Sequence, residues 1–98
     1  MMTLFEILQD IHALQEDLLM YERKYNLLSE VFYESYLQGD EPPDDAWVMD
    51  WNMWAGAYEI WLDRRIRYQQ AMAKLRNETS LVKVIEKAVR REPLPVAA

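Results

Sequence analysis

Two pairs of carboxylates are spaced to hold a metal ion: Glu30 with Glu34, and Glu59 with Asp63. Positions four residues apart share a face of a helix, so each pair offers oxygen ligands of the kind that Mg²⁺ prefers. A magnesium-dependent all-helical nucleotide hydrolase is therefore one hypothesis. It needs several such pairs converging inside a bundle, whereas Glu59 and Asp63 are expected on a polar, solvated face. We predict no metal site.

Other catalytic chemistry has few candidate residues. The chain has no cysteine, and His12 is its only histidine, so a catalytic triad or a zinc site of the Cys or His type is not expected. No glycine-rich phosphate loop is present either. The sequence predicts no catalytic residue and no cofactor, and we interpret the protein as a non-enzyme.

Composition indicates one soluble, folded domain. Of the 98 residues, 51% are hydrophobic and 12% aromatic, which argues against disorder. The first residues lack the pattern of a signal peptide, and no apolar run approaches the ~18–20 residues of a membrane span. We expect a cytoplasmic protein that does not enter a membrane.

Charge is segregated along the chain. Residues 25–63 carry nine acids and no base, whereas residues 64–91 carry nine bases and two acids. The net charge is −6, so direct nucleic-acid binding by this chain alone is not expected. The acidic middle favours a basic partner.

The elements that must position these residues are helices. Thr3 and Glu6 form a capping-box pattern, and apolar residues then recur at 3-4 spacing to Phe32, which predicts helix 1 over about 3–38. Gly39 is a suitable helix end, and Asp44 or Asp45 can cap a second helix after the turn 39–44. Helix 2 is predicted over about 45–77.

Two helices of equal length joined by a short turn predict a long antiparallel hairpin with coiled-coil-like packing, assembling into a helical bundle. Opposite positions then sum to about 82, which pairs Glu6 with Arg76 and Arg23 with Glu59. A short helix 3 is predicted over about 80–91, with a strand at 81–85 the weaker alternative. Residues 1–92 form one domain, and 93–98 are expected to be a flexible tail.

The segment 47–62 holds all four tryptophans, and its polar arc on a helix covers only about 60°. Two helices cannot bury all of its apolar surface, so this segment is predicted to serve both as core and as interface. The interface is formed with a second copy or with a different protein. Its predicted residues are Tyr25, Phe32, Tyr36, Trp47, Met49, Asp50, Trp51, Met53, Trp54, Tyr58, Ile60 and Trp61.

Asp50 lies among these apolar residues, where a carboxylate without a partner is costly. One interpretation is a first-turn acid that is favoured by the helix dipole and accepts a tryptophan N–H. The other is an acceptor for Arg or Lys from a partner chain.

The stretch 21–64 resembles small helical antitoxin-like proteins of prokaryotic toxin–antitoxin-type operons. The matching positions are Glu22, Lys24, Tyr25, Phe32, Tyr36, Gly39, Trp54, Tyr58 and Trp61. Members usually have glycine after the Lys-Tyr step, where this chain has Asn26. The resemblance implies a non-enzymatic partner that binds and silences a toxin, often a nuclease.

We therefore expect a protein–protein interaction module that binds a basic, nucleic-acid-processing protein encoded nearby. The alternative is a homodimer or higher helical bundle with no heterologous ligand. The predicted acidic patch near the turn comprises Glu30, Glu34, Asp40, Glu41, Asp44 and Asp45.

Overall fold

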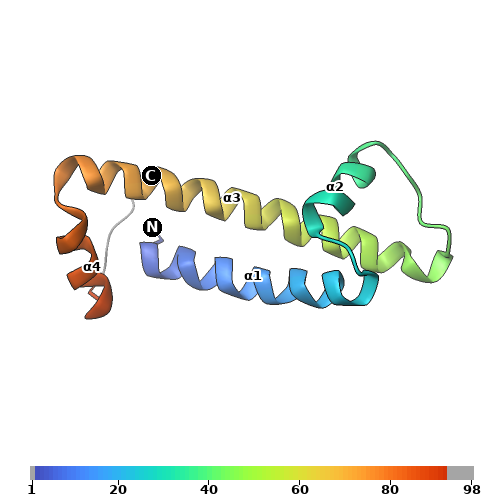
Figure 1. The fold of residues 1–98 in the computed structure, drawn as a ribbon, viewed down its shortest axis with the longest axis horizontal. Helices are drawn as coiled ribbons and strands as arrows, with labels where there is room; N and C mark the ends of the chain where they lie inside the picture. The colour runs from blue at the N-terminus through green and yellow to red at the C-terminus, as the bar shows by residue number, and fades with distance from the viewer. Residues whose placement is uncertain (1, 93–98) are drawn as a thin grey trace. The chain divides into compact units, whose positions relative to one another are not determined.

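The computed structural model describes residues 2–92 and is all-helical over this range, with no strand. Its elements are α1 (Leu4–Tyr25), α2 (Ser29–Leu37), the single 3-10 turn η1 (Asp45–Trp47), α3 (Val48–Glu78) and α4 (Leu81–Val89) (Figure 1). The all-helical class is confirmed. The strand alternative at 81–85 is wrong, because α4 occupies that stretch.

The capping signals predicted at Thr3, Gly39 and Asp44 are confirmed, and Ser80 supplies a further cap that was not predicted. The Thr3 Oγ1 accepts from the Glu6 backbone N–H at 3.2 Å, and Glu6 Oε1 accepts from the Thr3 N–H at 3.3 Å. Gly39 takes a left-handed φ of 83° after α2. Asp44 caps η1 by accepting from Ala46 N–H, and Ser80 caps α4. The expected tail 93–98 lies outside the described residues.

The predicted continuous helix over 3–38 is wrong, because the chain breaks between α1 and α2. Asn26 takes a left-handed φ of 53°, and the Leu27 N–H donates to the Glu22 carbonyl at 3.2 Å. This geometry ends α1 at Tyr25. Asparagine tolerates the left-handed region better than most residues, since its short polar side chain can bond locally.

The structure comprises two compact units. The central unit contains residues 12–62. The terminal unit contains residues 2–11 and 63–92 of the described range. The helices α1 and α3 each contribute one part to both units.

The central unit is held by an aromatic core that α1, α2 and α3 share. Trp54, 1% exposed, stacks on Phe32 with ring centroids 3.9 Å apart and planes 2° apart. It also stacks with Tyr21 and Tyr25. The fold-back of α2 therefore supplies the third helix that the aromatic segment of α3 needs, and it lies beside the start of α3 (Figure 1).

The terminal unit has a smaller core, in which α4 joins α1 and α3. Leu4, Ala71 and Val84 are buried together, and Tyr68, Met72 and Leu75 pack against them. Val84 is the only buried residue of α4. One side chain therefore anchors α4 in the core of this unit.

The predicted pairing of helices is wrong by about two helical turns. In the central unit Lys24 pairs with Asp50, whereas Glu59 accepts from Tyr33 of α2 and not from Arg23. In the terminal unit Asp10 pairs with Arg64. The physical reason is that α1 ends at Tyr25 and α3 begins at Val48, so the connection between them is far longer than a turn over 39–44.

Candidate interaction surface

The outward face of α3 in the central unit is apolar and open. Met49, Met53 and Ile60 are 71%, 58% and 47% exposed. At 100° per residue they fall on one stripe, opposite the buried side chains of Trp54 and Ala55. A helix that is apolar on opposite faces is usually covered on both. We call Met49, Met53, Gly56 and Ile60 the α3 stripe.

Gly56 lies within this stripe, where the chain itself does not require a glycine. A Cβ at Gly56 would meet no atom within 4 Å, and its φ is not in the left-handed region. Glycine in a helix interior costs about 0.5–1 kcal/mol relative to alanine. Because glycine has no side chain, the backbone of another helix can approach α3 closely at this position.

One edge of the α3 stripe is held by a three-residue polar contact. Lys24 Nζ lies 2.6 Å from Asp50 Oδ2, and Tyr25 Oη donates to the same oxygen at 2.7 Å. The bond from Lys24 has the larger effect and that from Tyr25 the next, and together they lower the pKa of the Asp50 carboxyl from its ordinary value. Burial, followed by the bond to Asp50, raises the pKa of Tyr25 to about 12.

This contact bears on both interpretations of Asp50. Its partners are Lys24 and Tyr25 of its own chain, not a partner's base, and no tryptophan N–H reaches it among the described hydrogen bonds. Asp50 therefore has a cationic partner within its own chain and lies in the first turn of α3, whereas its acceptance of Arg or Lys from another chain stays a prediction. The register of α1 against α3 brings Lys24 to it.

The other edge of the stripe is held by α2. Tyr33 Oη donates to Glu59 Oε1 at 3.0 Å, and Tyr36 Oη makes a longer contact of 3.4 Å with Asn52 Oδ1. The stripe therefore lies between two sets of contacts that fix α3 to its neighbours. Such support holds an exposed face in one geometry before any partner arrives.

A buried relay that the sequence did not indicate sets the position of α2. Trp54 Nε1 donates to Ser29 Oγ at 2.8 Å, and Ser29 Oγ donates to Glu22 Oε2 at 2.7 Å. The Ser29 backbone N–H also donates to Glu22 Oε2, at 2.9 Å. Glu22 thus caps α2 in place of Leu28, whose side chain cannot.

The predicted interface residues divide into three groups. Phe32 and Trp54 are buried in the central core, so the prediction that they contact another chain is corrected. Met49, Met53 and Ile60 are exposed. The remaining seven are half-buried: Tyr25, Tyr36, Trp47, Asp50, Trp51, Tyr58 and Trp61.

The surface around the stripe is acidic. The central unit carries eleven carboxylates against two bases, Arg23 and Lys24, a net charge of −9. All six residues of the predicted acidic patch are exposed: Glu30, Glu34, Asp40, Glu41, Asp44 and Asp45. Asp40 and Asp44 also accept local bonds, from Ser35 Oγ and the Ala46 N–H. The unit therefore presents apolar side chains in a strongly negative field.

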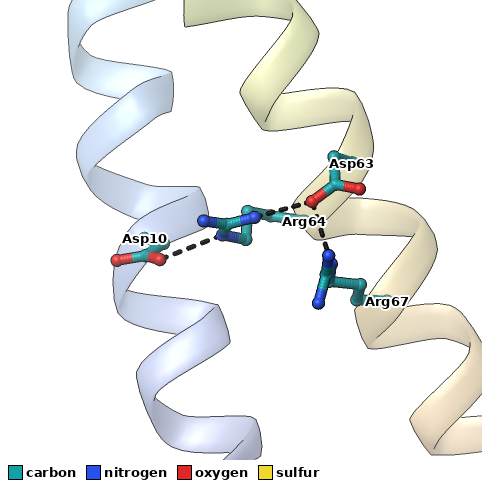
Figure 2. A network of polar contacts seen from close by, with 4 residues as sticks. All are labelled: Asp10, Asp63, Arg64 and Arg67. Atoms are coloured by element: carbon teal, nitrogen blue, oxygen red, sulfur yellow. Dashed lines mark hydrogen bonds and ion pairs between the residues drawn. The ribbon is translucent and has the colours of Figure 1, made fainter. Parts of the chain in front are cut away.

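The terminal unit carries six acids and nine bases, and part of its basic charge is paired within the unit. Arg64 bridges Asp10 of α1 at 3.1 Å and Asp63 at 2.6 Å, and Arg67 reaches Asp63 at 2.9 Å (Figure 2). The bond to Asp10 is the main cause that raises the pKa of Arg64. These pairs reduce the positive charge that two of these arginines could offer to a nucleic acid.

Two of the four carboxylates considered for magnesium, Glu59 and Asp63, are paired with other side chains. Glu59 accepts from Tyr33, and Asp63 accepts from Arg64 and Arg67. Within residues 2–92, no three His, Cys, Asp or Glu side chains gather in a way that would hold a metal ion. His12 is exposed on α1.

Comparisons with known proteins give no relative. No protein-family model, no curated protein and no solved structure matches this chain. None of the described helices combines the length and apolarity that crossing a membrane requires. The chemistry of the surface itself is therefore what indicates a function for this chain.

Proposed function

We propose that this protein is a non-enzymatic interaction module that binds and neutralises a basic, nucleic-acid-processing protein in the cytoplasm. The observation that carries the proposal is the exposed α3 stripe within a unit of net charge −9. In this proposal α1 and α3 form one long antiparallel hairpin, as the heptad pattern predicts.

The stripe combines affinity with adaptability. Methionine side chains are flexible and polarisable, so Met49 and Met53 can fit an irregular apolar partner surface. The surrounding carboxylates accelerate encounter with a basic partner and disfavour acidic ones. A nucleic-acid-processing protein carries the basic surface that this field attracts.

The resemblance to antitoxin-like proteins gains physical support at Asn26. Those proteins usually have glycine at this position, and here Asn26 adopts a left-handed φ of 53°. Glycine and asparagine are the two residues that best tolerate this conformation. A break between α1 and α2 at the same place is therefore compatible with the family pattern.

The test is co-expression of the full chain with the product of the adjacent gene, followed by purification and calorimetric titration. We expect a stable complex that neutralises the partner's activity. Met53→Glu should weaken binding at least tenfold, because it places a charge in the apolar contact. Ile66→Glu is the matched control, since Ile66 is a similarly exposed apolar residue of α3 in the terminal unit.

Absence of a complex with the adjacent product would refute the antitoxin-like role. Equal weakening by Met53→Glu and Ile66→Glu would refute the assignment of the stripe as the binding face. Circular dichroism and urea unfolding of both variants would show that each retains the fold. The rival function, a homo-oligomeric bundle without a heterologous ligand, predicts that the stripe is covered by a second copy alone.

A further inference from the structure

The helix α4 carries a second exposed apolar face, and this face lies in a basic unit, whereas the α3 stripe lies in an acidic one. Only Val84 of this helix is buried, at 4% exposed, against Leu4 and Ala71. Four other aliphatic residues remain between 43% and 77% exposed: Leu81, Val82, Ile85 and Val89. At helical spacing these residues share one broad face. Within residues 2–92, the terminal unit therefore leaves most of the apolar face of α4 uncovered.

The polar side of α4 is basic. Lys83, Lys87, Arg90 and Arg91 lie on or directly after it, with Glu86 as the acid within the helix. The α3 stripe lies in a unit of net charge −9, and α4 lies in a unit of net charge +3. The two open apolar faces of this chain are thus electrostatically complementary.

The dimensions also match. From Leu81 to Val89, α4 spans about 12 Å, and the stripe from Met49 to Ile60 spans about 16 Å, at ~1.5 Å rise per residue. Gly56 lies within that length, and its lack of a side chain lets a helix backbone approach closely. A helix of the size of α4 can therefore cover the stripe.

We infer that α4 of one copy docks on the α3 stripe of a second copy, and that two such reciprocal contacts form a homodimer. Pairing of stripe with stripe would bring two units of net charge −9 together, and pairing of α4 with α4 would bring two basic surfaces together. Juxtaposed like charges cost free energy, whereas docking of α4 on the α3 stripe of the other copy pairs opposite charges.

The dimer would regulate binding of a heterologous partner, because α4 and that partner would compete for the same stripe. This consequence rests on the proposed function, whereas the dimer itself does not. The two are distinguished by measuring self-association of the purified full chain in the absence of any partner.

The experiment combines light scattering and sedimentation for the wild type, Met53→Glu and Ile85→Glu. We expect the wild type to be a dimer. Its dissociation constant should rise at least tenfold when the salt concentration rises from about 0.05 M to about 0.5 M, because salt screens the attraction between opposite charges. Each variant should weaken self-association at least tenfold, and Ile66→Glu should leave it unchanged. Helical content by circular dichroism checks the fold of each variant.

Mixing the two variants gives the decisive result. The Met53→Glu chain keeps an intact α4, and the Ile85→Glu chain keeps an intact stripe, so the mixed dimer retains one complete contact. We expect the equimolar mixture to associate more strongly than either variant alone, and native mass spectrometry should detect the mixed species.

Several results would overturn the inference. A wild-type monomer would do so. Loss of association in Met53→Glu but not in Ile85→Glu would indicate stripe-to-stripe pairing, and the reverse would indicate pairing of α4 with α4. Association that strengthens with salt would also contradict it. Sedimentation of a monomeric chain with phosphatidylserine-containing vesicles, lost in Ile85→Glu, would assign the α4 face to lipid instead.

Discussion

Trp54 donates a buried hydrogen bond from Nε1 to Ser29 Oγ over 2.8 Å, and this bond joins α3 to the first residue of α2. Glu22 of α1 accepts from the same serine through both its hydroxyl and its backbone N–H. One small side chain therefore connects three helices. The opposite face of α3 at Trp54 is the apolar stripe, so this connection also orients the proposed binding surface.

Replacing Ser29 by alanine should lower the free energy of unfolding by about 1–3 kcal/mol, because the buried Trp54 N–H loses its acceptor. Urea unfolding followed by tryptophan fluorescence measures the change. Ser35→Ala is the control, since the Ser35 hydroxyl donates to exposed Asp40, and its cost should stay within about 0.5 kcal/mol. Similar costs for the two variants would contradict the role assigned to Ser29.

Asp50→Asn should reduce stability at neutral pH and matter progressively less in acid. The folded pKa of Asp50 lies below its ordinary value of 3.8, chiefly through the bond from Lys24. Its stabilising contribution is therefore present above that value and is lost as the pH falls through the lower, folded pKa. The urea midpoints of wild type and variant should converge below about pH 4. A gap that is constant from neutral pH to strong acid would contradict this account.

The same substitution can be checked in a Lys24→Met background. Because Lys24 is the first cause of the lowered pKa of Asp50, the pH dependence of the gap should shrink in that background. Tyr25 still donates to Asp50 there, so a smaller dependence should remain.

Tyr25→Phe should change the alkaline limit of stability. The pKa of Tyr25 is raised to about 12 from an ordinary 10.0 by burial and by the bond to Asp50. The neutral phenol is thus favoured in the fold, and its contribution is present below pH 10 and lost as the pH rises toward 12. Between these values the wild-type urea midpoint should fall more steeply than that of Tyr25→Phe. Parallel curves would show that Tyr25 does not carry this dependence.

The two glycines should respond in opposite directions to alanine. Gly56→Ala should raise the free energy of unfolding by about 0.5–1 kcal/mol, because Gly56 lies inside a helix and a Cβ there meets open space. Gly39→Ala should lower it by about 1–2 kcal/mol, because φ is 83° at Gly39. Thermal unfolding of both variants makes the comparison. Destabilisation by Gly56→Ala would mean that the helix needs this glycine within the chain.

Asn26 should tolerate glycine but not alanine. Its φ of 53° makes Asn26→Ala unfavourable by about 1–2 kcal/mol, whereas Asn26→Gly should change stability by less than about 1 kcal/mol. Urea unfolding distinguishes the two. If Asn26→Ala raised stability and helical content, α1 would be continuing through the break in solution.

The features that the sequence predicted correctly depend on neighbouring residues. The capping box at Thr3, the glycine end at Gly39 and the cap at Asp44 each involve contacts within three residues. The apolar excess on α3 was likewise visible from helical periodicity, which requires only the local geometry of a helix. The exposure of Met49, Met53 and Ile60 agrees with that excess.

The break after Tyr25 was not predictable from the same periodicity. Tyr25, Leu28 and Phe32 keep the 3-4 spacing across it, so one straight helix and two separate helices give the same pattern. Contacts distant in sequence favour the break: Glu22 with Ser29, Ser29 with Trp54, and Lys24 with Asp50. The sequence by itself determined where apolar and acidic surface would lie along each helix. Only the tertiary structure decided which aromatic residues became core and which face of α3 stayed open, because burial depends on which helices meet.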